Sequence, residues 1–96
     1  MTAIDLSGRV ALVTGGTQGL GEGMAKALAA AGARVMIADV NEAGTDTSAA
    51  LGEGHGFVRL DVTDDAGWEA ATATTVEQLG GLDVLVNNAG IEISSL

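Results

Sequence analysis

The sequence contains no cysteine, no proline and no tyrosine. Without cysteine the chain can form neither a disulfide nor a thiolate metal site, and a reducing compartment is expected. Phe57 and Trp68 are the only aromatic residues, so the core has to be built from aliphatic side chains and alanine. No stretch approaches the roughly 20 apolar residues that span a bilayer, and the N-terminus lacks the features of a signal peptide. A soluble, cytoplasmic protein is expected.

Positive charge is also scarce. Four basic residues face thirteen acidic ones, which gives a net charge of −9. This balance argues against binding to nucleic acid or to an anionic membrane surface. Any bound phosphate would have to be held by backbone N–H groups and a helix N-terminus. No cluster of carboxylates suggests a metal site, and none is predicted.

The 96 residues have the length of one small domain, and residues 1–96 are expected to form a single unit. Four short apolar runs alternate with helical segments, as is typical of parallel strands covered on both faces. The predicted strands are 9–14, 34–39, 56–62 and 82–88. The predicted helices end at the capping Gly32, at Leu51 and before the Gly80-Gly81 pair.

Two details of the later helices are predicted from side chains. Asn41 is expected to cap the second helix, and the third is expected to begin at Thr63 or Asp64. The face of the third helix expected to cover the sheet consists of Trp68, Thr72, Val76 and Leu79.

This β-α-β-α-β-α-β alternation predicts an α/β fold with a parallel sheet, because crossovers between parallel strands are right-handed. In the doubly wound scheme the strand order is 3-2-1-4. The first two helices then cover one face and the third covers the other. A binding site is expected at the carboxyl ends of the first and fourth strands, where the order reverses.

The first strand ends in a glycine-rich stretch, residues 14–21, that opens a helix. Gly15, Gly19 and Gly21 let a backbone approach phosphates closely, and the helix N-terminus offers free N–H groups. The stretch is therefore a candidate pyrophosphate site of a dinucleotide. It is no P-loop, because the Gly-Lys-Ser/Thr ending is missing and Lys26, the only lysine, lies inside the helix.

Asp39 closes the second strand, roughly 20 residues beyond the glycine stretch, where a carboxylate can bind both hydroxyls of an adenosine ribose. The same charge would repel a 2′-phosphate. The neighbouring Gln18, Val40 and Asn41 are uncharged, although NADP sites usually place a cation there. NAD is therefore predicted over NADP.

Two further strand ends carry candidate site residues. Asp61 and Val62 close the third strand and could reach the adenine edge, or Asp61 could simply cap the next helix. The fourth strand ends in Asn87 and Asn88, where an amide side chain can bond both a neighbouring strand and a ribose. Ala89 and Gly90 keep the backbone low, so that a nicotinamide ribose could pass over it. His55, in contrast, is expected at the surface away from this edge.

These motifs resemble the N-terminal half of a short-chain dehydrogenase/reductase, which has a Rossmann-type fold. Residues 14–21 match the family's Thr-Gly-x-x-x-Gly-x-Gly cofactor loop, and Asp39 matches the ribose-binding acid of its NAD-preferring members. Asp61-Val62 matches the adenine-pocket pair, and residues 87–90 match the Asn-Asn-Ala-Gly signature. Within the loop, the resemblance implies cofactor contacts by Thr17, Gln18 and Leu20.

The resemblance implies hydride transfer between a nicotinamide and a carbonyl or alcohol carbon. The family's catalytic serine, tyrosine and lysine have no counterparts in residues 1–96, so no catalytic residue is assigned and turnover by this chain alone is not expected. The chain is interpreted as the cofactor-binding part of an oxidoreductase, truncated before its catalytic segment. The alternative is a non-catalytic dinucleotide-binding or interaction module. The fourth strand is expected to be an open edge, and the chain is expected to self-associate through this uncovered edge and face of the sheet.

Overall fold

The computed structural model describes residues 4–17, 19–88 and 92–95. Within these residues it has five strands and three helices. In chain order they are β1 (Val10–Thr14), α1 (Gly19–Ala30), β2 (Arg34–Asp39), α2 (Gly44–Leu51), β3 (Gly56–Arg59), α3 (Asp65–Leu79), β4 (Val84–Asn87) and β5 (Glu92–Ser95).

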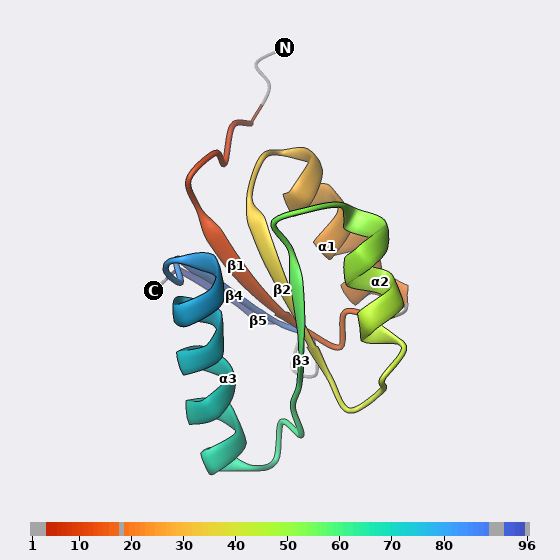
Figure 1. Cartoon of the computed structure of the whole chain (residues 1–96), viewed down its shortest axis with the longest axis vertical. Coiled ribbons are helices and arrows are strands. Elements are labelled where there is room, and N and C mark those ends of the chain that lie inside the picture. Colours follow the sequence, from red (N-terminus) through yellow and green to blue (C-terminus); the bar gives the residue numbers. More distant parts are fainter. Residues whose placement is uncertain (1–3, 18, 89–91, 96) are drawn as a thin grey trace.

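The strands form one sheet in the order β3-β2-β1-β4-β5. The first four strands are parallel, which confirms the predicted order 3-2-1-4. As expected, α1 and α2 lie on one face of the sheet and α3 lies on the other (Figure 1). β1 has a strand on each side and helices on both faces, so all five of its residues are buried.

Each face of the sheet has its own mainly aliphatic core, as the scarcity of aromatic residues requires. The buried residues on the α3 side are Val10, Leu12, Met36, Ala38, Leu60, Ala71 and Leu79. Those on the side of α1 and α2 are Val13, Ala25, Ala33, Val35, Ile37 and Val86. Alternate residues of β1 and β2 therefore point to opposite faces, the period expected of strands.

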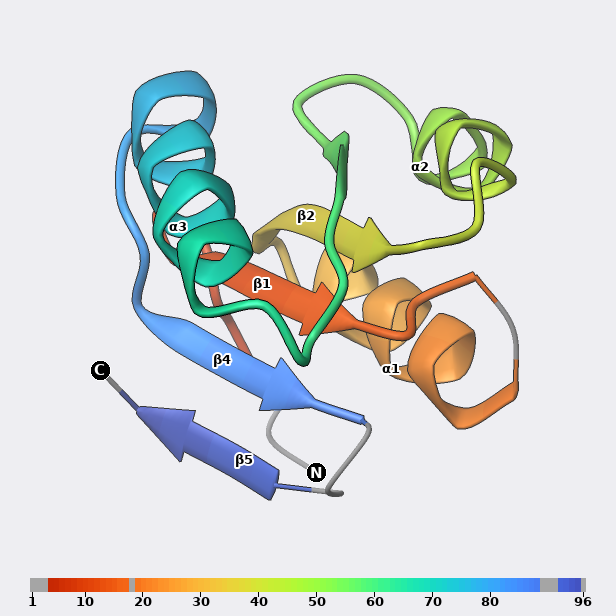
Figure 2. The same cartoon turned by 90° about the horizontal axis from the view of Figure 1, so that it is seen from below.

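The prediction that the fourth strand is an open edge is wrong. β5 pairs with β4 in antiparallel register, with Val84 opposite Ser95 and Asn87 opposite Glu92 (Figure 2). The antiparallel hairpin gives partners to backbone N–H and C=O groups that an edge strand would leave unpaired. In the part of the chain that the structure describes, the outer strands of the sheet are therefore β3 and β5.

The second helix begins later than predicted. It starts at Gly44, and the Asn41 side chain accepts a hydrogen bond from the Ala43 N–H, ahead of the helix. A Cβ atom at Gly44 would overlap the ring of Phe57, so the first turn lies directly against that side chain. β3 and β4 are also shorter than predicted: residues 60–62 lie beyond β3, and residues 82, 83 and 88 lie outside β4.

The predicted buried face of α3 is partly wrong. Leu79 is buried as expected, but the other buried residues are Ala71 and Thr75, while Val76 is 49% exposed. Thr75 can be buried because its hydroxyl donates a hydrogen bond to the Ala71 carbonyl within the helix, 2.7 Å away. The helix begins after Asp64, whose carboxylate accepts a hydrogen bond from the Ala66 N–H.

Candidate functional site

A cavity of about 290 Å³ lies at the carboxyl ends of the parallel strands. It is lined by Thr14, Gly15, Ala38, Asp39, Val40, Leu60, Asp61, Val62 and Asn88. The ends of β1, β2 and β4 and the residues after β3 thus converge on one place, where the strand order reverses. Of the predicted site residues, Gln18, Ala89 and Gly90 lie outside the residues that the structure describes.

A buried threonine joins the ends of β1 and β4. The backbone N–H of Asn88 donates to Thr14 Oγ1 over 3.0 Å, and that hydroxyl has Asn87 Oδ1 at 3.2 Å and the Val86 carbonyl at 3.3 Å as acceptors. The side chain of Asn87 is therefore engaged with the neighbouring strand, one of the two roles predicted for it. Asn88 rather than Asn87 lines the cavity.

The glycine loop is held close to both strands. Gly15 has a positive φ of 65°, and its N–H donates to the Ala38 carbonyl over 2.8 Å. A Cβ atom at Gly15 would come within 3.0 Å of the Asn88 side-chain nitrogen. A Cβ atom at Gly21 would overlap the Gly15 carbonyl oxygen. The first turn of α1 therefore rests on the loop, and only glycine fits at the contact.

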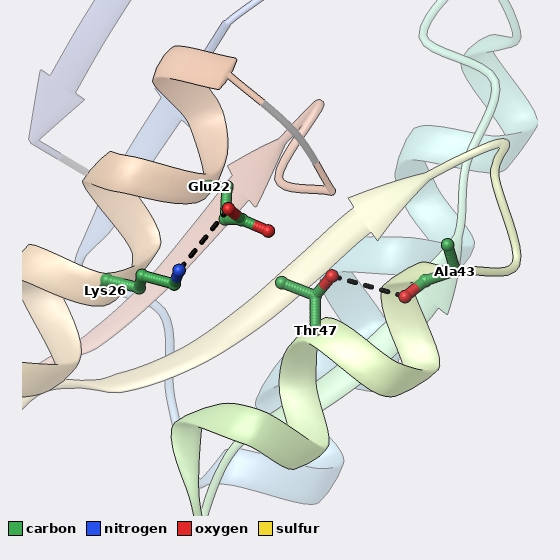
Figure 3. A network of polar contacts seen from close by, with 4 residues as sticks. All are labelled: Glu22, Lys26, Ala43 and Thr47. Atoms are coloured by element: carbon green, nitrogen blue, oxygen red, sulfur yellow. Dashed lines mark hydrogen bonds and ion pairs between the residues drawn. The ribbon is translucent and has the colours of Figure 1, made fainter.

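No lysine serves this loop. Lys26 lies on α1 with its Nζ atom 3.4 Å from Glu22 Oε1, one turn earlier in the helix (Figure 3). A bound phosphate would depend on the backbone N–H groups of the loop and of the first turn of α1. This agrees with the scarcity of cations in the sequence.

Both carboxylate oxygens of Asp39 already have donors from the protein. Oδ2 accepts a hydrogen bond from the Thr17 hydroxyl over 2.8 Å. Oδ1 accepts one from the Asn41 N–H over 3.0 Å. The carboxylate is thereby held at the cavity wall between the glycine loop and the turn after β2.

Two exposed valines stand at the walls of the cavity. Val40 is 53% exposed and Val62 is 36% exposed, although both are apolar. The Val62 carbonyl accepts a hydrogen bond from the indole N–H of Trp68 over 2.8 Å. Trp68 also packs on the α3 side of the core, so it is a packing residue, as predicted, and in addition it fixes one wall of the cavity.

Asp61 forms a local turn at the edge of the cavity. Its Oδ1 atom accepts hydrogen bonds from the hydroxyl and the backbone N–H of Thr63. These bonds hold the pKa of Asp61 below its usual value, and the bond from the Thr63 hydroxyl has the larger effect. Asp61 does not cap α3, because that role belongs to Asp64.

Positive charges near the cavity are few and paired. Arg59 lies opposite Asp39 in the register of β3 with β2, and its Nε atom is 3.7 Å from Glu42 Oε1. At the opposite end of the sheet, Arg34 donates to the Leu79 carbonyl. Residues 4–17 and 19–88 contain no group of three or more His, Asp or Glu side chains that could hold a metal ion.

His55 lies in the loop before β3, at the far end of the sheet from the cavity. It is half-buried, and its Nδ1 atom accepts a hydrogen bond from the Val35 N–H over 3.0 Å. Burial lowers the pKa of His55 below its ordinary value. Its role here is to hold the start of β2 to this loop.

Sequence reasoning gave no role at the site to Thr14 or to Val40, and it did not foresee that Thr17 bonds Asp39. Two sequence signals could have drawn attention to Thr14, which is the polar end of an otherwise apolar strand and the first residue of the Thr-Gly-x-x-x-Gly-x-Gly match. Among the described residues, no helix is long and apolar enough to cross a membrane.

Comparison with known proteins places this geometry among dehydrogenases. The family described as short chain dehydrogenase matches residues 9–96. The chain is 51% identical over 87 residues to a 3-beta-hydroxysteroid dehydrogenase from Comamonas testosteroni. It is 49% identical over 87 residues to a galactitol 2-dehydrogenase from Agrobacterium fabrum. Both matches cover 90% of this chain and 34% of the relative, so the chain spans about a third of the length of these relatives.

A solved structure gives the same result for the fold. A dehydrogenase/reductase from Sinorhizobium meliloti 1021 superposes on this chain with a TM-score of 0.82 at 41% sequence identity. The match covers 90% of this chain and 36% of that one.

Proposed function

The chain belongs to the short-chain dehydrogenase family, and we propose that it forms the NAD-binding part of an oxidoreductase of the cytoplasm. The observation that carries the proposal is the position of Asp39. Its carboxylate lies at the wall of a cavity beside a glycine loop that opens a helix. Bound NAD would supply the hydride acceptor for an alcohol carbon, and NADH the hydride donor for a carbonyl carbon.

The cavity suits the adenosine end of a dinucleotide. Asp39 would accept hydrogen bonds from the two ribose hydroxyls, and the adenine would lie between Val40 and Val62, where apolar surface is otherwise exposed. The pyrophosphate would lie over Gly15 and the first turn of α1. The two segments are in direct contact there, because a Cβ atom at Gly21 would overlap the Gly15 carbonyl oxygen. These contacts bind and orient the cofactor.

The other end of the cofactor would pass the end of β4. Asn88 lines the cavity beside Gly15, so a dinucleotide leaving the loop would meet this strand end next. We place the nicotinamide ribose there, along residues 87–90. Turnover by these 96 residues alone is not expected, because they contain no tyrosine to serve as the family's acid/base group.

NAD rather than NADP is the proposed cofactor. Asp39 places a negative charge where a 2′-phosphate would lie. Gln18 in the glycine stretch and Val40 and Asn41 after Asp39 carry no charge, and the charge of Arg59 is offset in part by Glu42, 3.7 Å from its Nε atom.

A second candidate is a self-contained dinucleotide-binding module without chemistry. The pairing of β5 with β4 favours it, because this hairpin gives the apolar strand β4 a partner from the same chain. Both candidates require a working adenosine site, so one experiment tests what they share.

The test is a calorimetric titration of the purified chain with NADH and with NADPH. Saturable NADH binding that Asp39→Ala abolishes is expected. Asp46→Ala removes the same charge from an exposed position on α2 and should leave the affinity for NADH unchanged. If Asp39→Ala binds NADH as tightly as the wild type, the proposed adenosine site is wrong.

A further inference from the structure

We propose that Thr17 sets the cofactor specificity of this site by fixing the orientation of the Asp39 carboxylate. The inference rests on the proposed function, because it concerns the same adenosine pocket. Thr17 belongs to the glycine loop, and its hydroxyl is 2.8 Å from Asp39 Oδ2.

The two protein donors bind different oxygens of the Asp39 carboxylate. An ionised carboxylate has about four acceptor positions, two on each oxygen. The Asn41 N–H uses one position on Oδ1, and the Thr17 hydroxyl uses one on Oδ2. One position remains on each oxygen, which matches the two hydroxyl groups of a ribose diol.

The Thr17 hydroxyl also limits the rotation of Asp39. The terminal torsion of an aspartate side chain is soft, and its rotamer wells are broad. With the Asn41 bond alone, the carboxylate could pivot about Oδ1, and the second bond removes that freedom. The donor comes from the loop rather than from the turn after β2, so the carboxylate is held from two directions.

A fixed carboxylate discriminates between the two cofactors. It accepts hydrogen bonds from both hydroxyls of the NADH adenosine ribose, whereas a 2′-phosphate offers no hydroxyl at that position and adds negative charge. Arg59 lies opposite Asp39 in the register of β3 with β2, and Glu42, 3.7 Å from its Nε atom, offsets part of its charge. Discrimination then depends on how firmly Asp39 is held in place.

The same bond makes one unit of the loop and the ribose site. The Gly15 N–H donates to the Ala38 carbonyl, and two residues later Thr17 donates to the next residue of β2, Asp39. The position of the phosphate-binding backbone is thereby set relative to the ribose-binding acid. Thr17 acts through Asp39 and is therefore a positioning residue.

The experiment is a titration of NADH and NADPH into Thr17→Val, which keeps the side-chain shape and removes the hydroxyl, and into Thr17→Ser, which keeps the hydroxyl. Loss of a hydrogen bond to a charged group is expected to weaken NADH binding by about tenfold in Thr17→Val. NADPH binding should change by less than about threefold, because its phosphate gains nothing from the fixed carboxylate. Thr17→Ser should restore the NADH preference.

Thr47→Val is the matched control. The Thr47 hydroxyl donates to the Ala43 carbonyl at the start of α2, over 3.2 Å, so the same substitution there removes a hydroxyl that contacts neither the loop nor Asp39 (Figure 3). Both affinities should match those of the wild type.

The possible failures are distinguishable. If the wild type binds NADH and Thr17→Val binds it equally well, this inference is wrong and the proposed function stands. If Thr17→Val weakens NADH and NADPH alike, or Thr17→Ser fails to restore the preference, the hydroxyl supports the loop in general and sets no specificity. If the wild type binds neither cofactor, the proposed function fails and this inference fails with it.

Discussion

The backbone N–H of Asn88 donates a hydrogen bond to the hydroxyl of Thr14, which lies 74 positions earlier in the chain. This bond connects the end of β4 with the end of β1 at the base of the cavity. The threonine side chain is completely buried, and the bond itself is partly buried at the cavity. Beyond the backbone pairing of the two strands, this hydroxyl is therefore a side-chain link between the two motifs.

Replacing Thr14 by valine should lower the free energy of unfolding by about 1–3 kcal/mol, because the partly buried Asn88 N–H and Asn87 Oδ1 lose the hydroxyl as a partner. Urea denaturation followed by circular dichroism measures the change. Thr75→Val is the control, since Thr75 is equally buried but its hydroxyl donates only to a carbonyl of its own helix. The control should change stability by less than about 1 kcal/mol. Equal effects of the two substitutions would contradict the assigned role of Thr14.

Gly21→Ala should destabilise the chain and weaken NADH binding, because the new methyl group would overlap the Gly15 carbonyl oxygen. Displacing a packed backbone in this way costs about 1–3 kcal/mol. Gly23→Ala, two residues further along α1, meets nothing within 4 Å and should stabilise the helix by up to about 1 kcal/mol. In thermal unfolding, Gly21→Ala should lower Tm and Gly23→Ala should raise it if α1 rests on the loop as described.

The stability of the chain should fall as the pH falls below the ordinary pKa of histidine. Burial lowers the pKa of His55 in the folded state, so the unfolded chain binds a proton first. The stabilisation is fully present above about pH 6.5 and is lost as the pH falls from there towards the folded pKa. A protonated Nδ1 could no longer accept the Val35 N–H.

His55→Asn offers an amide oxygen in place of Nδ1 and has no proton to bind in this range. Its unfolding free energy should therefore vary less between pH 7.5 and 5.5 than that of the wild type, as measured by urea denaturation at each pH. Asp5 and Asp61 do not confuse the comparison, because their lowered pKa values put their titration at more acidic pH. Parallel pH profiles for the two proteins would show that His55 contributes nothing to the pH dependence of the unfolding free energy.

Replacing residues 92–95 by alternating glycine and asparagine should increase self-association. Glycine and asparagine form strands poorly, so β5 would be lost and the edge of β4 would be uncovered. Light scattering over a range of concentrations measures the apparent mass. Glu53→Asn, which makes the exposed loop 52–54 Gly-Asn-Gly outside the sheet, is the control and should leave the mass unchanged. If the two variants have equal mass, β5 does not protect the edge.

The strand order and the place of the cavity could be predicted from the sequence because they depend on local signals. Continuous apolar runs, a glycine stretch and a terminal Asp39 fix which strand ends meet once right-handed crossovers are assumed. β5 is not predicted, because four residues that include two serines and a glutamate carry no strand pattern of their own. They form a strand because they pair with β4.

The errors within elements have a related cause. Threonine and alanine occur on several sides of α3, so its hydrophobic pattern does not set the phase of the helix, and Val76 was placed on the wrong face. The bond between Thr17 and Asp39 depends on how two side chains turn towards each other across a loop. Spacing in the sequence carries no information about that orientation.

The indole of Trp68 gives the chain a built-in optical reporter. It is the only tryptophan, and the sequence has no tyrosine, so nearly all ultraviolet emission of the protein comes from this one ring. Its N–H is bonded to the carbonyl of Val62, a residue of the cavity wall. A molecule entering the cavity would disturb the surroundings of the ring, and a reduced nicotinamide would absorb part of its emission. Binding could thus be followed by fluorescence without any label.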